Sequence, residues 1–133
     1  MRRKLFRTGA AFAFFAVIFG AFGAHALKEH LSPEQLASFE TGVRYQFYHA
    51  FALLILAQLM YKRKNKLILY AGWLFIAGTV LFSGSIYLLA LRNIVGFSGS
   101  WLGPVTPIGG ALLIIGWALL FMSSFKDNEF KRG

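Results

Sequence analysis

The segment LILYAGWLFIAGTVLFSGSIYLLAL at residues 67–91 decides the fold, because it contains no Asp, Glu, Lys or Arg. Three further runs share this property, at residues 8–27, 45–61 and 101–125. A helix of about 20 apolar residues, rising about 1.5 Å per residue, spans the hydrocarbon core of a bilayer. The runs therefore predict an all-α integral membrane four-helix bundle, with membrane helices at about 8–27, 45–61, 67–91 and 104–125.

Basic residues are distributed unevenly between these runs. The first seven residues hold four of them and the 62–66 loop holds four more, whereas the 28–44 segment has two basic residues against three acidic ones. Because Lys and Arg resist translocation, we expect both termini and the 62–66 loop on the cytoplasmic side. The 28–44 and 92–105 loops are then expected on the outer side.

The composition supports a single membrane domain over residues 1–133. A soluble domain of 133 residues with 57% hydrophobic content would bury too little surface to hide four such runs. The net charge of +9 comes mostly from basic residues that flank the runs, where they contact membrane lipids, so we expect no nucleic-acid partner. Without Cys, the chain has no thiolate nucleophile and no Cys-ligated metal.

The chain start and the first connection each carry a recognisable pattern. Residues 1–26 are similar to a secretory signal with an A-x-A site, but we expect the run to remain as a membrane helix. Ser32, Pro33 and Gln35 predict a helix N-terminus with a capping box. Apolar residues then recur at spacings of three and four, which predicts a short interfacial amphipathic helix at about 33–41, with a bend at Gly42.

Most of the polar residues of the runs lie in the half of the bundle that this orientation places at the outer side of the membrane. They are His25, Arg44, Tyr45, Gln46, His49, Ser83, Ser85, Tyr87 and Thr106. Gln46 and His49 share one face of their helix, and Ser83 and Tyr87 share a face of the next. Because polar groups in lipid need partners, we predict that these faces turn inward and form a hydrogen-bonded lock around His25 and His49.

A second interpretation makes the two histidines ligand-binding residues. His25 and His49, on adjacent helices at similar depth, could hold a b-type haem, or one of them could donate to a quinone. The position of residues 42–49 near the interface, and the absence of a second histidine pair in the runs, favour the structural interpretation.

The groups that catalysis would need are missing from the sequence. No run contains Asp or Glu, so the essential carboxylate of a small proton-coupled exporter is absent. No Ser-His-acid set, metal-ligand cluster or phosphate-binding glycine loop occurs at a meaningful spacing. We therefore expect no enzymatic activity, no cofactor and no metal, and a small transporter or channel remains a weaker alternative.

Four blocks of the chain, at residues 20–27, 41–50, 82–91 and 103–110, read GAFGAHAL, TGVRYQFYHA, FSGSIYLLAL and GPVTPIGG. In this order they resemble the motifs of the YgdD/YwdK family, small four-helix bacterial membrane proteins with relatives in animals and an uncharacterised function. The resemblance covers nearly the whole chain. It implies a multi-pass protein of the bacterial inner (plasma) membrane, and it supplies no catalytic residue, substrate or cofactor.

Small residues in the first run suggest close contacts between membrane helices. Ala16, Gly20 and Ala24 repeat every four residues, and such stripes let helices approach closely in lipid. Together with the small size and the missing catalytic set, they favour an accessory or stabilising subunit of a larger membrane complex. The expected partner is another membrane protein or a second copy of the chain.

Overall fold

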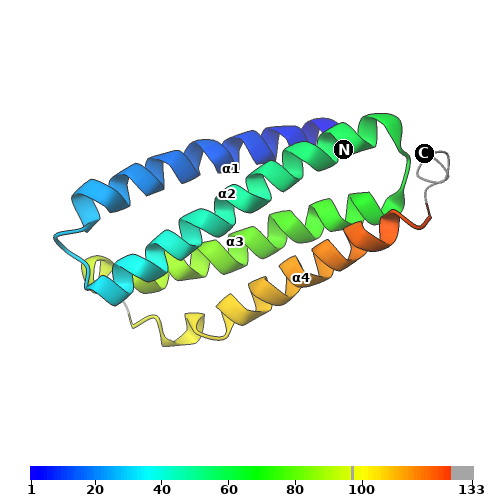
Figure 1. Ribbon diagram of the computed structural model, residues 1–133. Coiled ribbons are helices and arrows are strands. Elements are labelled where there is room, and N and C mark those ends of the chain that lie inside the picture. The colour runs from blue at the N-terminus through cyan, green and yellow to red at the C-terminus, as the bar shows by residue number, and fades with distance from the viewer. Residues whose placement is uncertain (97, 127–133) are drawn as a thin grey trace.

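The computed structural model describes residues 1–96 and 98–126, and its long elements are all helices. They are α1 (Arg2–Phe22), which continues into the π-helical turn η1 (Gly23–Leu27), α2 (Pro33–Lys62), α3 (Lys66–Val95), the 3-10 turn η2 (Ser100–Leu102) and α4 (Val105–Ser123). Successive long helices run in opposite directions along one common axis (Figure 1). The predicted four-helix bundle is therefore present.

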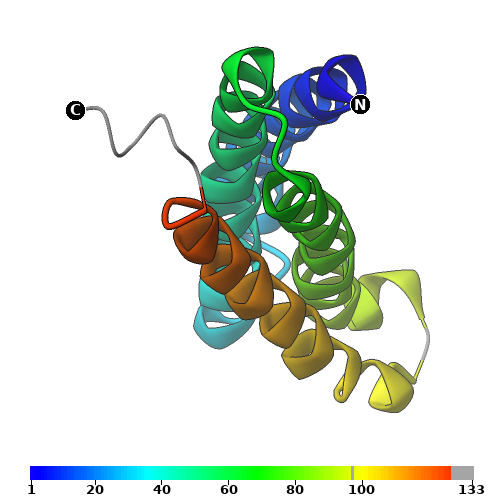
Figure 2. The same cartoon turned by 90° about the vertical axis from the view of Figure 1, so that its right-hand side faces the viewer.

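The two middle helices form the centre of the bundle. The main packing pairs are α1 with α2, α2 with α3, and α3 with α4, and α1 and α4 lie on opposite sides of the α2–α3 pair (Figure 2). Leu5 from α1 and Leu113 from α4 reach the same buried cluster as Leu53 of α2 and Phe75 of α3. Most of the surface of α1 and α4 consequently faces outward.

Three helical segments are long and apolar enough to cross a membrane, at residues 2–27, 66–95 and 100–123. Helix α2 contains the charge-free run 45–61 and is 30 residues long. Its mean hydropathy is nevertheless too low for it to count as a fourth such segment. Its polar residues explain this difference, since Gln46 and His49 are both buried inside the bundle. A helix whose polar groups face other helices does not need a wholly apolar sequence.

The interfacial helix expected at 33–41 is not a separate element. Its N-terminus forms as predicted, because Ser32 Oγ accepts from the Gln35 backbone N–H (3.1 Å) and Gln35 Oε1 accepts from the Ser32 N–H (3.0 Å). The helix then continues without a break to Lys62. Phe39 and Val43 of the apolar stripe are buried against α1 and α3 rather than laid on a membrane surface.

The expected bend at Gly42 is also absent, and the glycine has another use. A Cβ atom at this position would lie 2.7 Å from a ring carbon of Tyr87, closer than real side chains approach. The bare backbone of α2 thus makes room for the Tyr87 ring, which packs on Phe39 with ring centroids 5.0 Å apart. The glycine permits helix packing and leaves the helix straight.

Glycine also sets the distance between α3 and α4. A Cβ atom at Gly109 would overlap the backbone nitrogen of Phe82, and one at Gly116 would lie 2.8 Å from the Phe75 ring. In contrast, no described atom lies within 4 Å of the Cβ position of Gly84 on α3.

We predict that Gly109→Ala destabilises the bundle by about 2–3 kcal/mol, because the new methyl group meets backbone that cannot rotate away. The matched variant Gly84→Ala should change the free energy of unfolding by less than about 1 kcal/mol, since its methyl group enters open space and alanine favours the helix. Thermal or SDS-induced unfolding in detergent measures both. Equal losses in the two variants would contradict the close approach at Gly109.

Candidate functional site: the polar network and the groove between α1 and α3

Gln46 is the residue through which three helices are joined. Its Nε2 donates to the carbonyl oxygen of Phe12 on α1 (2.7 Å), and its Oε1 accepts from the hydroxyl of Tyr87 on α3 (2.6 Å). The side chain is 6% exposed, so both bonds form away from solvent. A buried amide with both ends bonded fixes the rotation of α2 against α1 and α3.

Two serines of α3 form further bonds between helices. Ser83 Oγ donates to the Gly42 carbonyl of α2 at 2.8 Å, and Ser85 Oγ lies 2.6 Å from Thr106 Oγ1 at the start of α4. Ser85 also donates to the Phe82 carbonyl (3.0 Å), so the Thr106 hydroxyl is the donor in the bond to Ser85. These bonds connect α2, α3 and α4 on the side expected to face outward.

His49 is fully bonded, and its partners define its tautomer. Nδ1 lies 2.7 Å from the Tyr45 carbonyl oxygen, which can only accept, so Nδ1 carries the proton. Nε2 then accepts from the indole N–H of Trp117 on α4 at 3.0 Å. The neutral ring thereby joins α2 to α4 and also packs edge-on against Phe75 of α3.

Three residues of the predicted cluster take little or no part in these bonds. Tyr45 contributes its carbonyl and packs its half-exposed ring on Phe82 of α3. Arg44 is exposed and donates to Thr41 Oγ1 on its own helix at 3.1 Å. His25 lies exposed in η1. Hydrogen bonds between the helices therefore form as predicted, but His25 takes no part in them. They form several separate connections and not one network around two histidines.

The residues present do not fit a haem held between His25 and His49. Gln46 bonds Phe12, and Gly9 lies against Ala50, so His49 is level with residues 9–12 of α1. His25 lies 13 residues beyond Phe12, about 20 Å along the helix at about 1.5 Å per residue. Two axial ligands must face one iron, and the His49 Nε2 lone pair is already occupied by Trp117. The expectation of similar depth was wrong.

A groove of about 350 Å³ opens between α1 and α3 beside the Gln46 connection. Its walls are apolar, with Phe15 and Phe19 on α1 and Val80 on α3, and Gly84 contributes no side chain. Thr79 also lines the groove, and its hydroxyl is buried and makes no hydrogen bond within residues 1–96 and 98–126. A buried hydroxyl without a partner is unfavourable in an apolar medium.

Sequence reasoning missed two residues of this region. Trp117 lies in an apolar run without other polar residues nearby, and only its contact with α2 reveals it as the partner of His49. Thr79 is not part of the predicted cluster. Its position in α3 at the same face as Ser83, four residues on, was the available signal.

The arrangement of the helices and of their polar side chains defines the class of this protein. Four antiparallel helices, three of them able to span a bilayer, are held together by buried polar bonds between helices and expose large apolar side chains outward. This is the architecture of a helical integral membrane protein.

Comparison with known proteins identifies the family. A family described as "Protein of unknown function (DUF423)" matches residues 19–110. The UPF0382 membrane protein SAB0533 of Staphylococcus aureus strain bovine RF122 is 44% identical over 118 residues, covering 89% of this chain and 92% of the relative. YwdK of Bacillus subtilis, also a UPF0382 membrane protein, is 42% identical over 119 residues, 89% of this chain and 93% of the relative.

A UPF0382 membrane protein of Haemophilus influenzae is 39% identical over 131 residues, covering 97% of this chain and 99% of the relative. No solved structure matches the chain significantly. The chain therefore belongs to the DUF423 family of membrane proteins, and the resemblance to YwdK seen in the sequence is confirmed. The family's function is unknown.

We predict that Gln46→Leu and His49→Leu each destabilise the bundle by about 1–2 kcal/mol, the scale of a hydrogen bond between helices in lipid. Gln46→Leu leaves the Tyr87 hydroxyl without its acceptor, and His49→Leu does the same to the Trp117 indole. His25→Leu is the control and should change stability by less than about 0.5 kcal/mol. If thermal unfolding in detergent is unchanged in both test variants, these bonds do not stabilise the fold.

Proposed function

We propose that this chain is a non-enzymatic, four-pass protein of the bacterial inner (plasma) membrane that serves as an accessory or stabilising subunit of a larger membrane complex. It docks its partner in the groove between α1 and α3. The observation that carries this proposal is the apolar groove on the outside of the bundle, where Gly84 leaves the α3 wall without a side chain.

The absence of catalysis is supported by the state of the polar groups. Gln46, His49, Tyr87, Ser83, Ser85 and Thr106 are all hydrogen-bonded to one another or to neighbouring helices. A nucleophile or general base needs a free lone pair facing a space that substrate can enter. The network occupies the His49 Nε2 lone pair with the Trp117 N–H, and it commits the hydroxyl protons of Ser83 and Tyr87 to α2.

The shape of the groove fits a membrane helix of a partner. Gly84 leaves the α3 backbone open, and small residues at such a position let a second helix approach closely. Phe15 and Phe19 supply a rigid apolar wall on the opposite side.

A second copy of the chain fits the groove less well than a different protein. A dimer whose two-fold axis passes through the groove would place the groove against the same groove, because such an interface is self-complementary. Two hollows do not fill one another. The partner we propose therefore carries a protruding helix.

The charges and the alternating helix directions support four crossings and cytoplasmic termini. Arg2 and Arg7 begin α1 at the same end of the bundle as Lys62 and Lys66 (Figure 1). Three glutamates, Glu29, Glu34 and Glu40, lie at the opposite end. Because α2 runs antiparallel to both α1 and α3, a membrane crossed by those two helices would also be crossed by α2, despite its more polar sequence.

The orientation can be tested directly because the chain contains no Cys. In spheroplasts, a membrane-impermeant maleimide should label the Glu29→Cys variant, while Lys64→Cys should react only after lysis. Labelling of both variants before lysis would mean that α2 does not cross the membrane. The reversed pattern would place the basic end outside.

The docking role predicts that purification in mild detergent at native expression recovers a stoichiometric membrane protein with the wild type. Gly84→Phe fills the groove and should lose that protein, whereas Ile114→Phe on the exposed face of α4 should retain it. Thr79→Val should stabilise the isolated chain by about 1 kcal/mol, since it removes an unpaired buried hydroxyl.

Mass spectrometry of the purified complexes and thermal unfolding of the isolated variants supply the two measurements. A homodimer, or a monomer without partner in the wild type, would overturn the accessory role. Recovery of the same protein with Gly84→Phe would show that docking does not use this groove.

A further inference from the structure

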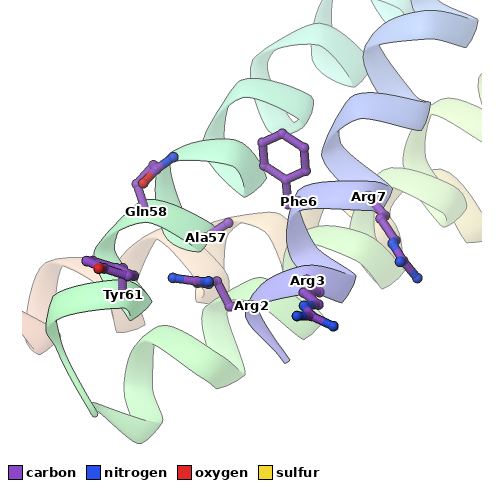
Figure 3. A pocket seen from close by; sticks show the side chains of 7 residues that line it. All are labelled: Arg2, Arg3, Phe6, Arg7, Ala57, Gln58 and Tyr61. Atoms are coloured by element: carbon purple, nitrogen blue, oxygen red, sulfur yellow. The ribbon is translucent and has the colours of Figure 1, made fainter.

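A basic hollow lies at the other end of the α1–α2 pair, away from the groove and from the polar network. Its volume is about 400 Å³, and it is formed by the first two turns of α1 and the last turns of α2. Figure 3 shows its side chains, which are Arg2, Arg3, Phe6, Arg7, Gln58 and Tyr61, together with Ala57. The hollow combines guanidinium groups with an amide and a phenol.

The positive charge of this hollow is not balanced by the part of the chain that the structure describes. None of Arg2, Arg3 and Arg7 pairs with a carboxylate within residues 1–96 and 98–126, where the acidic residues all lie in the 28–44 segment at the far end. The positive end of the α1 dipole adds to the same field. An anion placed here would therefore meet several donors and no carboxylate of residues 1–96 and 98–126.

Arg2 is held in position for binding. Its guanidinium carbon lies 4.8 Å from the centroid of the Tyr61 ring, in a cation–π contact that joins α1 to α2. The planar face of the group is used by the ring, while its N–H edge remains available for a bidentate bond to phosphate. Arg3 and Arg7, one turn apart, extend together from the other flank of α1 (Figure 3).

An apolar groove continues from this hollow toward the middle of the bundle. It has a volume of about 640 Å³, shares Phe6, Gln58 and Tyr61 with the hollow, and is lined further along α2 by Leu54 and Ile55. From Lys62 to Leu54 is eight residues, about 12 Å along the helix. A charged hollow followed by an apolar groove of this length matches a phospholipid headgroup and the first part of its acyl chain.

We propose that this two-part site binds one anionic phospholipid. Arg2 binds the phosphate, Arg3 adds to the positive charge around it, the Gln58 amide donates to the headgroup, and Tyr61 holds Arg2 in place. Phe6 and Ile55 contact the acyl chain. The apolar groove distinguishes this ligand from free phosphate, which would gain nothing from it, and the arginines distinguish it from a zwitterionic lipid, whose own cation they would repel.

Native mass spectrometry of the detergent-purified protein, titrated with phosphatidylglycerol or with phosphatidylcholine of the same acyl chains, tests the headgroup preference. The wild type should bind phosphatidylglycerol at least tenfold more tightly. R2Q/R3Q should lose about tenfold or more in affinity, the loss of bidentate charge-assisted bonds. The matched double variant K4Q/K64Q removes the same charge outside the site and should lose less than threefold.

A second pair of variants tests the apolar part. Ile55→Trp fills the groove and should weaken phosphatidylglycerol binding about tenfold, whereas Ile114→Trp on α4 should leave it unchanged. Millimolar glycerol 3-phosphate, which has the phosphate but no chain, should not displace the lipid.

Three outcomes would overturn the proposal. Equal losses for R2Q/R3Q and K4Q/K64Q would mean a diffuse surface charge. Displacement of the lipid by glycerol 3-phosphate would mean a site for free phosphate esters. Equal affinity for the two lipids would mean that the headgroup is not recognised. Six of the seven side chains of the hollow are exposed, all but Ala57, so thermal unfolding should confirm that the arginine variants remain folded.

Discussion

The constraint on which the structure depends is that a polar group in an apolar medium must find its partner inside the protein. Gln46 meets this constraint by bonding the Phe12 carbonyl with one end and the Tyr87 hydroxyl with the other. His49 meets it by donating to Tyr45 and accepting from Trp117. These two residues of α2 join it to α1, α3 and α4, so the most polar helix becomes the central one.

Glycine supplies the close approach that these short bonds require. The ring of Tyr87 reaches Gln46 because Gly42 has no side chain in its way. On the other side, Gly109 brings the α4 backbone against Phe82, and Thr106 at the start of α4 then reaches Ser85. Hydrogen bonding and packing are thus coupled, because a larger residue at either glycine would separate the helices that the bonds join.

What the bundle does not satisfy internally indicates where it meets other molecules. An apolar groove opens between α1 and α3, and Gly84 leaves its α3 wall without a side chain. The arginines at the start of α1 surround a hollow without a described carboxylate. The groove fits the proposed partner helix, and the hollow fits the proposed lipid phosphate.

The sequence by itself determined the helical class, the ends of the long charge-free runs and the capping box at Ser32, because these depend on hydropathy, charge and local hydrogen bonds. It also indicated that Gln46, His49, Ser83 and Tyr87 would turn inward. Only the tertiary structure decided which partners they take, that residues 33–41 belong to α2, and that His25 stays outside. Those outcomes depend on the register between helices, which is set by contacts distant in sequence such as Gln46 with Phe12 and Trp117 with His49.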